Sequence, residues 1–185
     1  MSDASGNSAP NSTSTGGTRF WIVVAAQDRV DAAVAGAYVE VTYGKAGPLE
    51  RMRPGDGVAC YSPRTRHPDG EVLQAFTALG RIADAPIYQR PDLHQPFRRT
   101  AQWFPVVAAP MRPLLPELAF IRNKASWGAV FRYGFLRVPR EDFARIAHAL
   151  GCPFDEVWPA DGANPAELPP RARRARASAD AAVDA

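Results

Sequence analysis

The amino-acid sequence predicts an α+β fold, a small mixed β-barrel with short helices packed on its ends. Short segments rich in β-branched and aromatic residues recur along the chain, and only a few segments show the apolar spacing of a helix. Several short strands with few helices between them are typical of a small barrel whose openings are covered by helices.

The first predicted strand runs from Arg19 to Ala26, where residues 20–24 are all β-favouring types. Further strands are predicted at residues 37–43, 58–62, 73–82, 102–107, 130–133 and 136–138. Residues 84–100 contain several prolines and are expected to be irregular.

Three helices are predicted. The first has Asp28 as its N-cap and Gly36 just past its end, and the second begins at Pro48 and runs through Met52. The last begins at Pro139, and its apolar side chains share one face: Phe143, Ile146, Ala147 and Leu150. Residues 110–118 contain too many prolines for more than a single helical turn.

The two ends of the chain differ from its middle. Residues 1–17 are rich in Ser, Thr, Gly and Asn, and residues 152–185 are rich in Pro, Ala and Arg. We therefore predict disordered tails at 1–17 and 152–185 around one domain at 18–151. The four tail arginines are expected to be solvated, and their contribution to binding is left open.

The chain shows no membrane or secretion signal. Its first eighteen residues contain no apolar run, and the longest such run, Phe20 to Ala26, is too short to span a bilayer. Cys60 and Cys152 match no zinc or redox spacing and suggest no disulfide framework. We expect a reduced, cytoplasmic protein that does not contact membranes.

Charge favours a polyanionic partner. The whole chain carries a formal charge of +3, but residues 18–151 hold 18 Lys and Arg against 12 Asp and Glu, a balance of +6. A modestly basic domain favours nucleic acid, although many ordinary domains carry a similar charge.

The segment from Phe120 to Gly134 concentrates aromatic and basic side chains. Trp127–Gly128 interrupts any helical pattern, so we predict a loop that leads into a strand. Flat rings beside cations are typical of sites that stack a planar anionic ligand, most often nucleic acid. The alternative is that Trp127 and Phe131 belong to the core while the basic side chains extend outward.

No catalytic or metal site is evident. His67, His94 and His148 have no Cys, Ser or carboxylate neighbour at the spacing of a nucleophile–base pair. No phosphate loop, zinc-ligand cluster or dinucleotide fingerprint occurs either. We predict a protein that is not an enzyme and needs no cofactor, although residues distant in sequence could still assemble a catalytic group.

An ordered series of short motifs runs from about Arg19 to about Leu150. The first half contains Trp21–Ile22–Val23–Val24–Ala25, Gly44–Lys45, Pro48–Leu49, Met52, Gly55–Asp56 and Tyr61–Ser62–Pro63. Phe76–Thr77–Ala78, Gly80, Tyr88–Gln89 and Phe97–Arg98–Arg99 follow. Pro113–Leu114, Phe120–Ile121, Asn123–Lys124, Ser126–Trp127–Gly128 and Phe131–Arg132 complete it. The series resembles the EVE domain, in particular the stand-alone bacterial EVE proteins, an uncharacterised family.

This resemblance implies a PUA-like fold, a twisted mixed β-barrel related to the YTH and ASCH domains. Several relatives bind RNA or DNA and hold a single, often modified, base in an aromatic pocket. EVE domains are also fused to restriction-type modules, which this chain lacks, so an effector would be a separate protein. The sequence departs from the family at Ala26, where a Ser is common, which puts a polar contact from that position in doubt.

The resulting hypothesis is that a modified or flipped base stacks between Trp21, Trp127 and Phe131. The full set of expected pocket residues is Trp21, Tyr61, Ser62, Pro63, Asn123, Ser126, Trp127 and Phe131, with Ser62 and Asn123 reading the base edge. The expected phosphate partners are Lys45, Arg98, Arg99, Lys124 and Arg132. Two alternatives stay open: a small planar metabolite or nucleotide as ligand, and an enzyme that acts on modified nucleotides. RNA versus DNA, the modification and the oligomeric state are not predicted.

Overall fold

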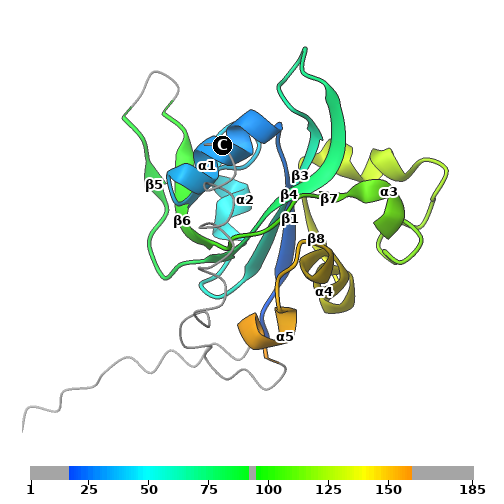
Figure 1. Ribbon diagram of the computed structural model, residues 1–185. Coiled ribbons are helices and arrows are strands. Elements are labelled where there is room, and N and C mark those ends of the chain that lie inside the picture. The colour runs from blue at the N-terminus through cyan, green and yellow to red at the C-terminus, as the bar shows by residue number, and fades with distance from the viewer. Residues whose placement is uncertain (1–16, 92–94, 160–185) are drawn as a thin grey trace, which may run out of the picture.

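The computed structural model describes residues 17–91 and 95–159, which form a curled mixed sheet, a half-barrel, with short helices on both sides (Figure 1). Six strands follow the order β2-β6-β4-β3-β1-β8, while β5 pairs with β6 and β7 pairs with β4. The strands are β1 Phe20–Val24, β2 Tyr38–Val39, β3 Gly57–Arg64, β4 Val72–Ile82, β5 Tyr88–Gln89, β6 Phe97–Trp103, β7 Ala109–Pro110 and β8 Phe135–Val138.

The helices are short and lie between the strands in sequence. They are α1 Gln27–Ala35, α2 Ala46–Glu50, α3 Met111–Leu114, the 3₁₀ helix η1 Trp127–Tyr133, α4 Arg140–Ala149 and α5 Phe154–Val157. Helices α1 and α2 lie on one side of the sheet, and α3, α4 and α5 lie on the other (Figure 1).

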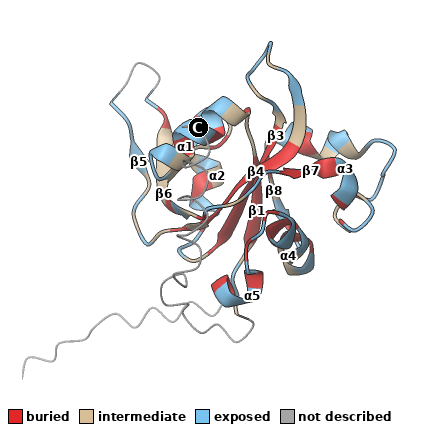
Figure 2. Cartoon of the chain, viewed as in Figure 1, coloured by how far each residue is buried: buried red, intermediate tan, exposed pale blue. Residues whose placement is uncertain are grey.

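Each face of the sheet has its own apolar core, because side chains alternate along a strand. In β1, Phe20 and Ile22 point toward α4 and α5, whereas Trp21 and Val23 point toward α1 and α2. Buried residues are concentrated along the central strands β1, β3 and β4 (Figure 2). Two side chains adjacent in β1 therefore belong to different cores.

Strand register brings the candidate site together. β1 pairs in parallel with β3, which places Val24 opposite Tyr61, and it pairs antiparallel with β8. The backbone N–H of Val24 also donates to the carbonyl oxygen of Gly134, at 2.9 Å. The end of β1, the middle of β3 and the end of η1 therefore meet at one end of the sheet.

Most of the predicted elements are confirmed. The strands expected at residues 19–26, 58–62, 73–82 and 136–138 are β1, β3, β4 and β8, and the expected last helix is α4. The single helical turn expected within residues 110–118 is α3. The second helix, α2, begins two residues earlier than expected, and Asp28 lies in the first turn of α1, whose N-cap is Ala26.

Three predicted strands are wrong in part or whole. Of the strand expected at residues 37–43, only Tyr38–Val39 forms β2, and Thr42 and Tyr43 adopt left-handed backbone. The strand expected at residues 102–107 is β6, which covers Phe97–Trp103 instead. Its position is set by pairing with β2, β4 and β5, and these strands are distant in sequence or very short. The strand expected at residues 130–133 is instead the 3₁₀ helix η1. It ends at Gly134, whose φ of 72° lies in the left-handed region that glycine adopts readily.

The packed domain extends past the expected boundary at Gly151. Phe154, Val157 and Trp158 are buried in the same core as Phe20, and the Trp158 indole donates to the Gly55 carbonyl at 3.1 Å. Apolar side chains in a Pro-containing segment thus complete the core. The remaining residues of the two predicted tails, 1–16 and 160–185, lie outside the described residues.

Candidate nucleic-acid interface

An aromatic cluster lies where β3 meets η1. Tyr61 of β3 stacks on Phe131 of η1, with ring centroids 4.0 Å apart and an angle of 21° between the rings. Trp127 stands edge-on to both rings, at 6.4 Å from Tyr61 and 6.1 Å from Phe131. Offset stacks and edge-on contacts are the arrangements that aromatic pairs prefer, so this geometry fixes the orientation of Trp127.

Trp127 differs from the other three tryptophans. The indole N–H groups of Trp21, Trp103 and Trp158 each donate a hydrogen bond, to the carboxylate of Asp56 and to backbone carbonyls. Trp127 is only half-buried, and its indole N–H donates to none of the described residues. A partly exposed ring with a free donor can both stack on a planar ligand and hydrogen-bond to it.

The loop before Trp127 is fixed by its own polar side chains. The Asn123 carboxamide oxygen accepts from the backbone N–H groups of Ala125 and Ser126, at 3.1 and 3.2 Å, as in an Asx turn. The Lys124 ammonium donates to the carbonyls of Leu115 and Leu118, both at 2.7 Å. Trp127 is therefore presented from a preorganised segment.

A buried carboxylate anchors the other end of this segment. The two oxygens of Asp142, in the first turn of α4, accept from the backbone N–H groups of Ala119 and Phe120, at 3.0 and 2.7 Å. Phe120 in turn lies edge-on to Phe131, at 6.2 Å. Helix α4 thus ties the start of the predicted binding segment to the core.

The structure places Trp21 away from Trp127. Trp21 is 2% exposed, stacks on Phe135 at 4.8 Å, and belongs to the core on the opposite face from Phe131. A base cannot lie between Trp21 and Trp127, because the sheet separates them. The expected pocket between these two rings is wrong, and Tyr61 is the ring that accompanies Trp127 and Phe131.

Ser62 and Asn123 also differ from the roles expected of them. Ser62 is 0% exposed, and its hydroxyl shares a 2.7 Å hydrogen bond with the Thr77 hydroxyl. Asn123 uses its oxygen within the loop, which leaves only its exposed amide NH₂ free of the described residues. Ser126 is exposed and Pro63 is half-buried. Reading of a base edge by Ser62 would require it to leave a buried hydrogen bond.

Three of the five expected phosphate partners have structural contacts. Arg98 pairs with Glu40 at 2.9 Å and lies over the Tyr38 ring, and Lys124 holds the two carbonyls described above. Arg99 donates to the Met52 carbonyl at 2.8 Å, and burial lowers the pKa of its guanidinium.

The remaining two cations are free. Lys45 and Arg132 are exposed and make no ion pair or hydrogen bond to the described residues through their side chains. They lie on the loop before α2 and at the end of η1. Free exposed cations are the ones available to contact phosphate.

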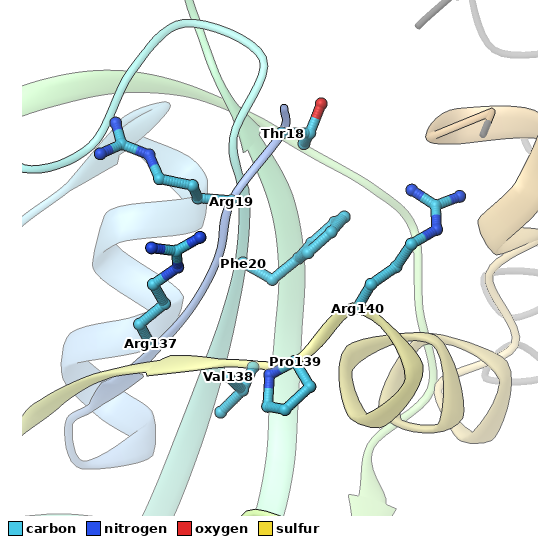
Figure 3. A pocket seen from close by; sticks show the side chains of 7 residues that line it. All are labelled: Thr18, Arg19, Phe20, Arg137, Val138, Pro139 and Arg140. Carbon is cyan, nitrogen blue, oxygen red and sulfur yellow. The ribbon is translucent and has the colours of Figure 1, made fainter. Parts of the chain in front are cut away.

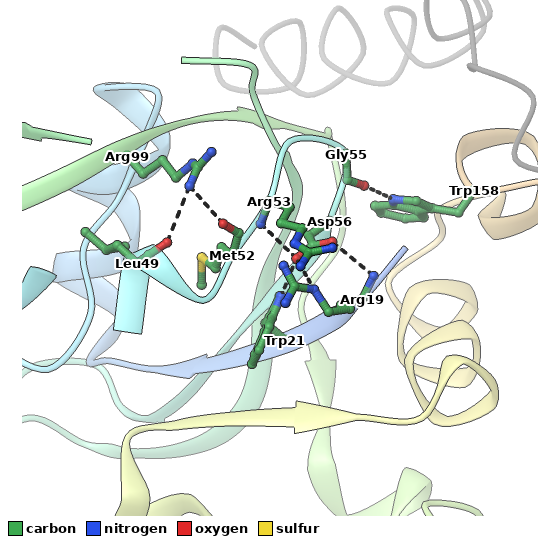
Figure 4. A network of polar contacts seen from close by, with 9 residues as sticks. All are labelled: Arg19, Trp21, Leu49, Met52, Arg53, Gly55, Asp56, Arg99 and Trp158. Carbon is green, nitrogen blue, oxygen red and sulfur yellow. Dashed lines mark hydrogen bonds and ion pairs between the residues drawn. The ribbon is translucent and has the colours of Figure 1, made fainter. Parts of the chain in front are cut away.

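Asp56 and Phe76 were not among the predicted site residues, but each contacts a ring that was. Asp56 is buried and accepts from the Trp21 indole at 2.8 Å and from the backbone N–H groups of Arg19 and Arg53, a network shown in Figure 4. Phe76 lies opposite Tyr61 in β4 and edge-on to it, at 5.6 Å. The alternation of residues in β4 was the available signal for Phe76, whereas the contact between Asp56 and Trp21 joins residues 35 apart.

A hollow lies at the start of β1, at the other end of this strand from the aromatic cluster. It has a volume of about 450 Å³ and is lined by Thr18, Arg19, Phe20, Arg137, Val138, Pro139 and Arg140 (Figure 3). Arg19 and Arg137 point to one side of Phe20 and Arg140 points to the other (Figure 3). Arg140 also donates to the Trp158 carbonyl and lies 4.6 Å from the Phe154 ring. These guanidinium groups do not converge on one point.

Among the described residues, no group of three or more His, Cys, Asp and Glu side chains is arranged to hold a metal ion. Burial raises the pKa of the Cys60 thiol to about 12, and burial together with Glu156 raises the pKa of the Cys152 thiol to about 11.

His67 and His148 are exposed, and His94 lies outside the described residues. No helix of the described part is long and apolar enough to cross a membrane.

Comparison with known proteins identifies the family. Residues 19–149 match the EVE domain. The chain belongs to the EVE family. The PUA-like fold expected from the sequence is thereby confirmed, and the resemblance to EVE proteins holds over nearly all of the described residues.

Several bacterial proteins are similar to this chain over most of its length. A UPF0310 protein of Mycolicibacterium vanbaalenii is 42% identical over 140 residues, covering 74% of this chain and 96% of the relative. The UPF0310 protein YdcG of Bacillus subtilis is 32% identical over 136 residues, covering 72% and 93%. Among solved structures, the Pho92 YTH domain in complex with m6A matches 74% of this chain and 85% of its own, with 12% identity and a TM-score of 0.44.

Proposed function

We propose that this EVE protein is a non-catalytic module that binds nucleic acid and recognises a modified or unpaired base at Trp127. The observation that carries the proposal is the state of this side chain: it is half-buried, oriented by Tyr61 and Phe131, and its N–H donates to none of the described residues. The family supports a binding module of this kind.

Energetics favour a base that is already unpaired or easily extruded. Stacking on an aromatic ring contributes roughly 1–3 kcal/mol per base, and extruding a paired base costs a few kcal/mol. One ring therefore does not offset extrusion from a stable duplex. Lys45 and Arg132 would add phosphate contacts, each weakened by salt.

Binding without chemistry agrees with the side chains present. Both thiols are buried and have raised pKa values, which disfavours either as a nucleophile. The Tyr61 hydroxyl also has its pKa raised, to about 12, by burial, so it remains protonated at neutral pH. It is not available as a general base.

The test is binding to short single strands of DNA and RNA, each with one central base: unmodified, N6-methyladenine, 5-methylcytosine or 5-hydroxymethylcytosine. We expect one base to be preferred and Trp127→Ala to weaken its binding by roughly 5- to 100-fold, the equivalent of one lost stack. Trp103→Ala is the matched control, because Trp103 is also half-buried but lies on β6.

Three results would contradict the proposal. Equal affinity for every strand, unchanged in Trp127→Ala, would show only a basic surface. Tight binding of free nucleosides that does not change between 50 and 200 mM salt would identify a small planar molecule as the ligand, because phosphate contacts make affinity salt-dependent. Conversion of any strand to a product would show an enzyme.

A further inference from the structure

Two exposed tyrosines lie beside the candidate interface without a role in it. Tyr43 is 85% exposed and Tyr133 is 79% exposed, the two highest values among the large apolar and aromatic side chains that are described as exposed. Neither ring contacts another ring or a cation of the described residues. Single exposed apolar side chains are ordinary on a surface, so the case for these two rings rests on where they lie.

The backbone under Tyr43 is unusual. Thr42, Tyr43 and Gly44 have φ angles of 49°, 59° and 79°, so three consecutive residues occupy the left-handed region. Non-glycine residues seldom adopt it, and a β-branched residue such as Thr42 is a genuine outlier there. Strain of this kind persists only where the surrounding structure imposes it, and it is concentrated at functional sites.

Hydrogen bonds hold this left-handed turn in place. The N–H groups of Gly44 and Lys45 donate to the Val41 carbonyl at 3.1 and 3.2 Å, and the Phe97 N–H donates to the Gly44 carbonyl at 2.9 Å. A side chain at position 44 would approach Pro96 to 2.5 Å, so glycine is required. Tyr43 is thus exposed on a fixed turn.

The turn is adjacent to the end of η1. A Cβ atom added to Gly134 would stand 3.8 Å from the Thr42 hydroxyl oxygen, which makes the backbone beside Tyr133 a neighbour of the backbone beside Tyr43. Gly134 also accepts a hydrogen bond from Val24, which lies opposite Tyr61. The two tyrosines and the Trp127 cluster therefore share one end of the sheet.

The distance from Trp127 to Tyr133 exceeds the length of one nucleotide. Trp127 and Tyr133 are the first and last residues of η1, and a 3₁₀ helix rises about 2.0 Å per residue, so they are roughly 12 Å apart along it. Stacked nucleotides repeat every ~3.4 Å along a strand, so this length corresponds to three or four nucleotide steps. A ligand that reaches both Trp127 and Tyr133 is longer than a nucleotide.

We infer that Tyr43 and Tyr133 form a stacking platform for nucleotides that flank the base at Trp127, and that the ligand is a single strand of nucleic acid. The inference rests on the proposed function. Exposed rings next to the free cations Lys45 and Arg132 combine the two features that bind single strands without sequence preference, base stacking and backbone attraction. A duplex would not offer its base faces to these rings.

The experiment compares the strand of the panel above that binds best with the 5′-monophosphate of its central base. Tyr43→Ala and Tyr133→Ala should each weaken strand binding roughly 5- to 100-fold and leave monophosphate binding within twofold. Tyr43→Phe should retain strand binding, since a ring remains. Tyr88→Ala is the matched control, because Tyr88 is 39% exposed on β5 and should have no effect.

The outcomes separate this inference from the proposed function. Normal strand binding by both alanine variants, with Trp127→Ala still defective, would overturn the platform and leave base recognition intact. If no strand binds the wild-type protein, both fail. If the alanine variants bind strands normally but lose a self-association that light scattering detects in the wild type, the tyrosines form a protein contact instead. Melting curves of all variants check that each is folded.

Discussion

Asp56 is predicted to be the side chain on which the position of Trp21 most depends. Its carboxylate is 2% exposed and accepts hydrogen bonds from the Trp21 indole and from the backbone N–H groups of Arg19 and Arg53, at 2.8, 3.0 and 2.9 Å. It also pairs with the Arg19 guanidinium at 3.2 Å (Figure 4). Asp56→Ala would leave these donors and a largely buried cation without their acceptor.

The expected loss of stability is about 3–5 kcal/mol, the cost of removing one partner from a buried, hydrogen-bonded ion pair. A buried donor left unsatisfied costs about 1–3 kcal/mol. Four such costs would add up to more than about 3–5 kcal/mol, but the costs of neighbouring contacts are not additive. Trp21→Phe removes one donor and should cost about 1–2 kcal/mol, with less than additive loss in the double variant.

The assay is urea unfolding followed by far-UV circular dichroism, with Glu71→Ala as the control because Glu71 is exposed. At about 3 °C per kcal/mol for a domain of this size, Asp56→Ala should also melt about 9–15 °C lower. A loss below 1 kcal/mol, or full additivity with Trp21→Phe, would refute the network. Trp21→Phe should bind nucleic acid like the wild type, which separates this buried indole from the one at Trp127.

Two further predictions concern buried or bonded side chains. Lys124→Met should destabilise the fold by about 1.5–3 kcal/mol in urea titrations, because two carbonyls lose a charged donor. Lys45→Met should change the stability by less than about 0.5 kcal/mol and should instead reduce salt-dependent binding. Equal effects of the two variants on stability would contradict these roles. Burial raises the pKa of the Cys60 thiol from 9.0 to about 12, so unfolding releases a proton above pH 9 and stability falls as pH rises from 9 toward 12, by at most about 1.4 kcal/mol per pH unit from this group. Cys60→Ala should flatten this dependence of stability on pH. In the native protein at pH 7.5, both thiols should resist alkylation by iodoacetamide until urea is added. Rapid modification of the native protein would show that the thiols are accessible.

Local patterns predicted the parts of the fold that depend on local sequence. The run Phe20–Val24 and the apolar face of α4 are found where the sequence places them, since alternation and helical spacing reflect burial directly. β6 was placed too late because the prolines within residues 84–100 predicted irregular chain where the strand begins. Within β6, Arg98 donates to Glu40, and Arg99 donates to the Leu49 and Met52 carbonyls. These contacts join residues 47 to 58 positions apart.

The candidate site was predicted in composition but not in geometry. The sequence singled out Trp127, Phe131 and Tyr61, which the structure brings together. It could not show which side of the sheet each ring faces, and so it grouped Trp21 with them. The decisive contact of Trp21 is with Asp56, and no local signal distinguishes a tryptophan that has such a partner from one that lacks it.

The most direct test of the account uses the four indole N–H signals in a ¹⁵N-labelled protein, assigned with Trp127→Phe. During titration with the preferred single strand, the Trp127 signal should shift strongly, because its N–H donates to none of the described residues and the proposed ligand would stack on this ring. The signals of Trp21, Trp103 and Trp158, whose N–H groups already donate within the fold, should move little. A shift of the Trp21 signal with the Trp127 signal unmoved would contradict the assignment of the site.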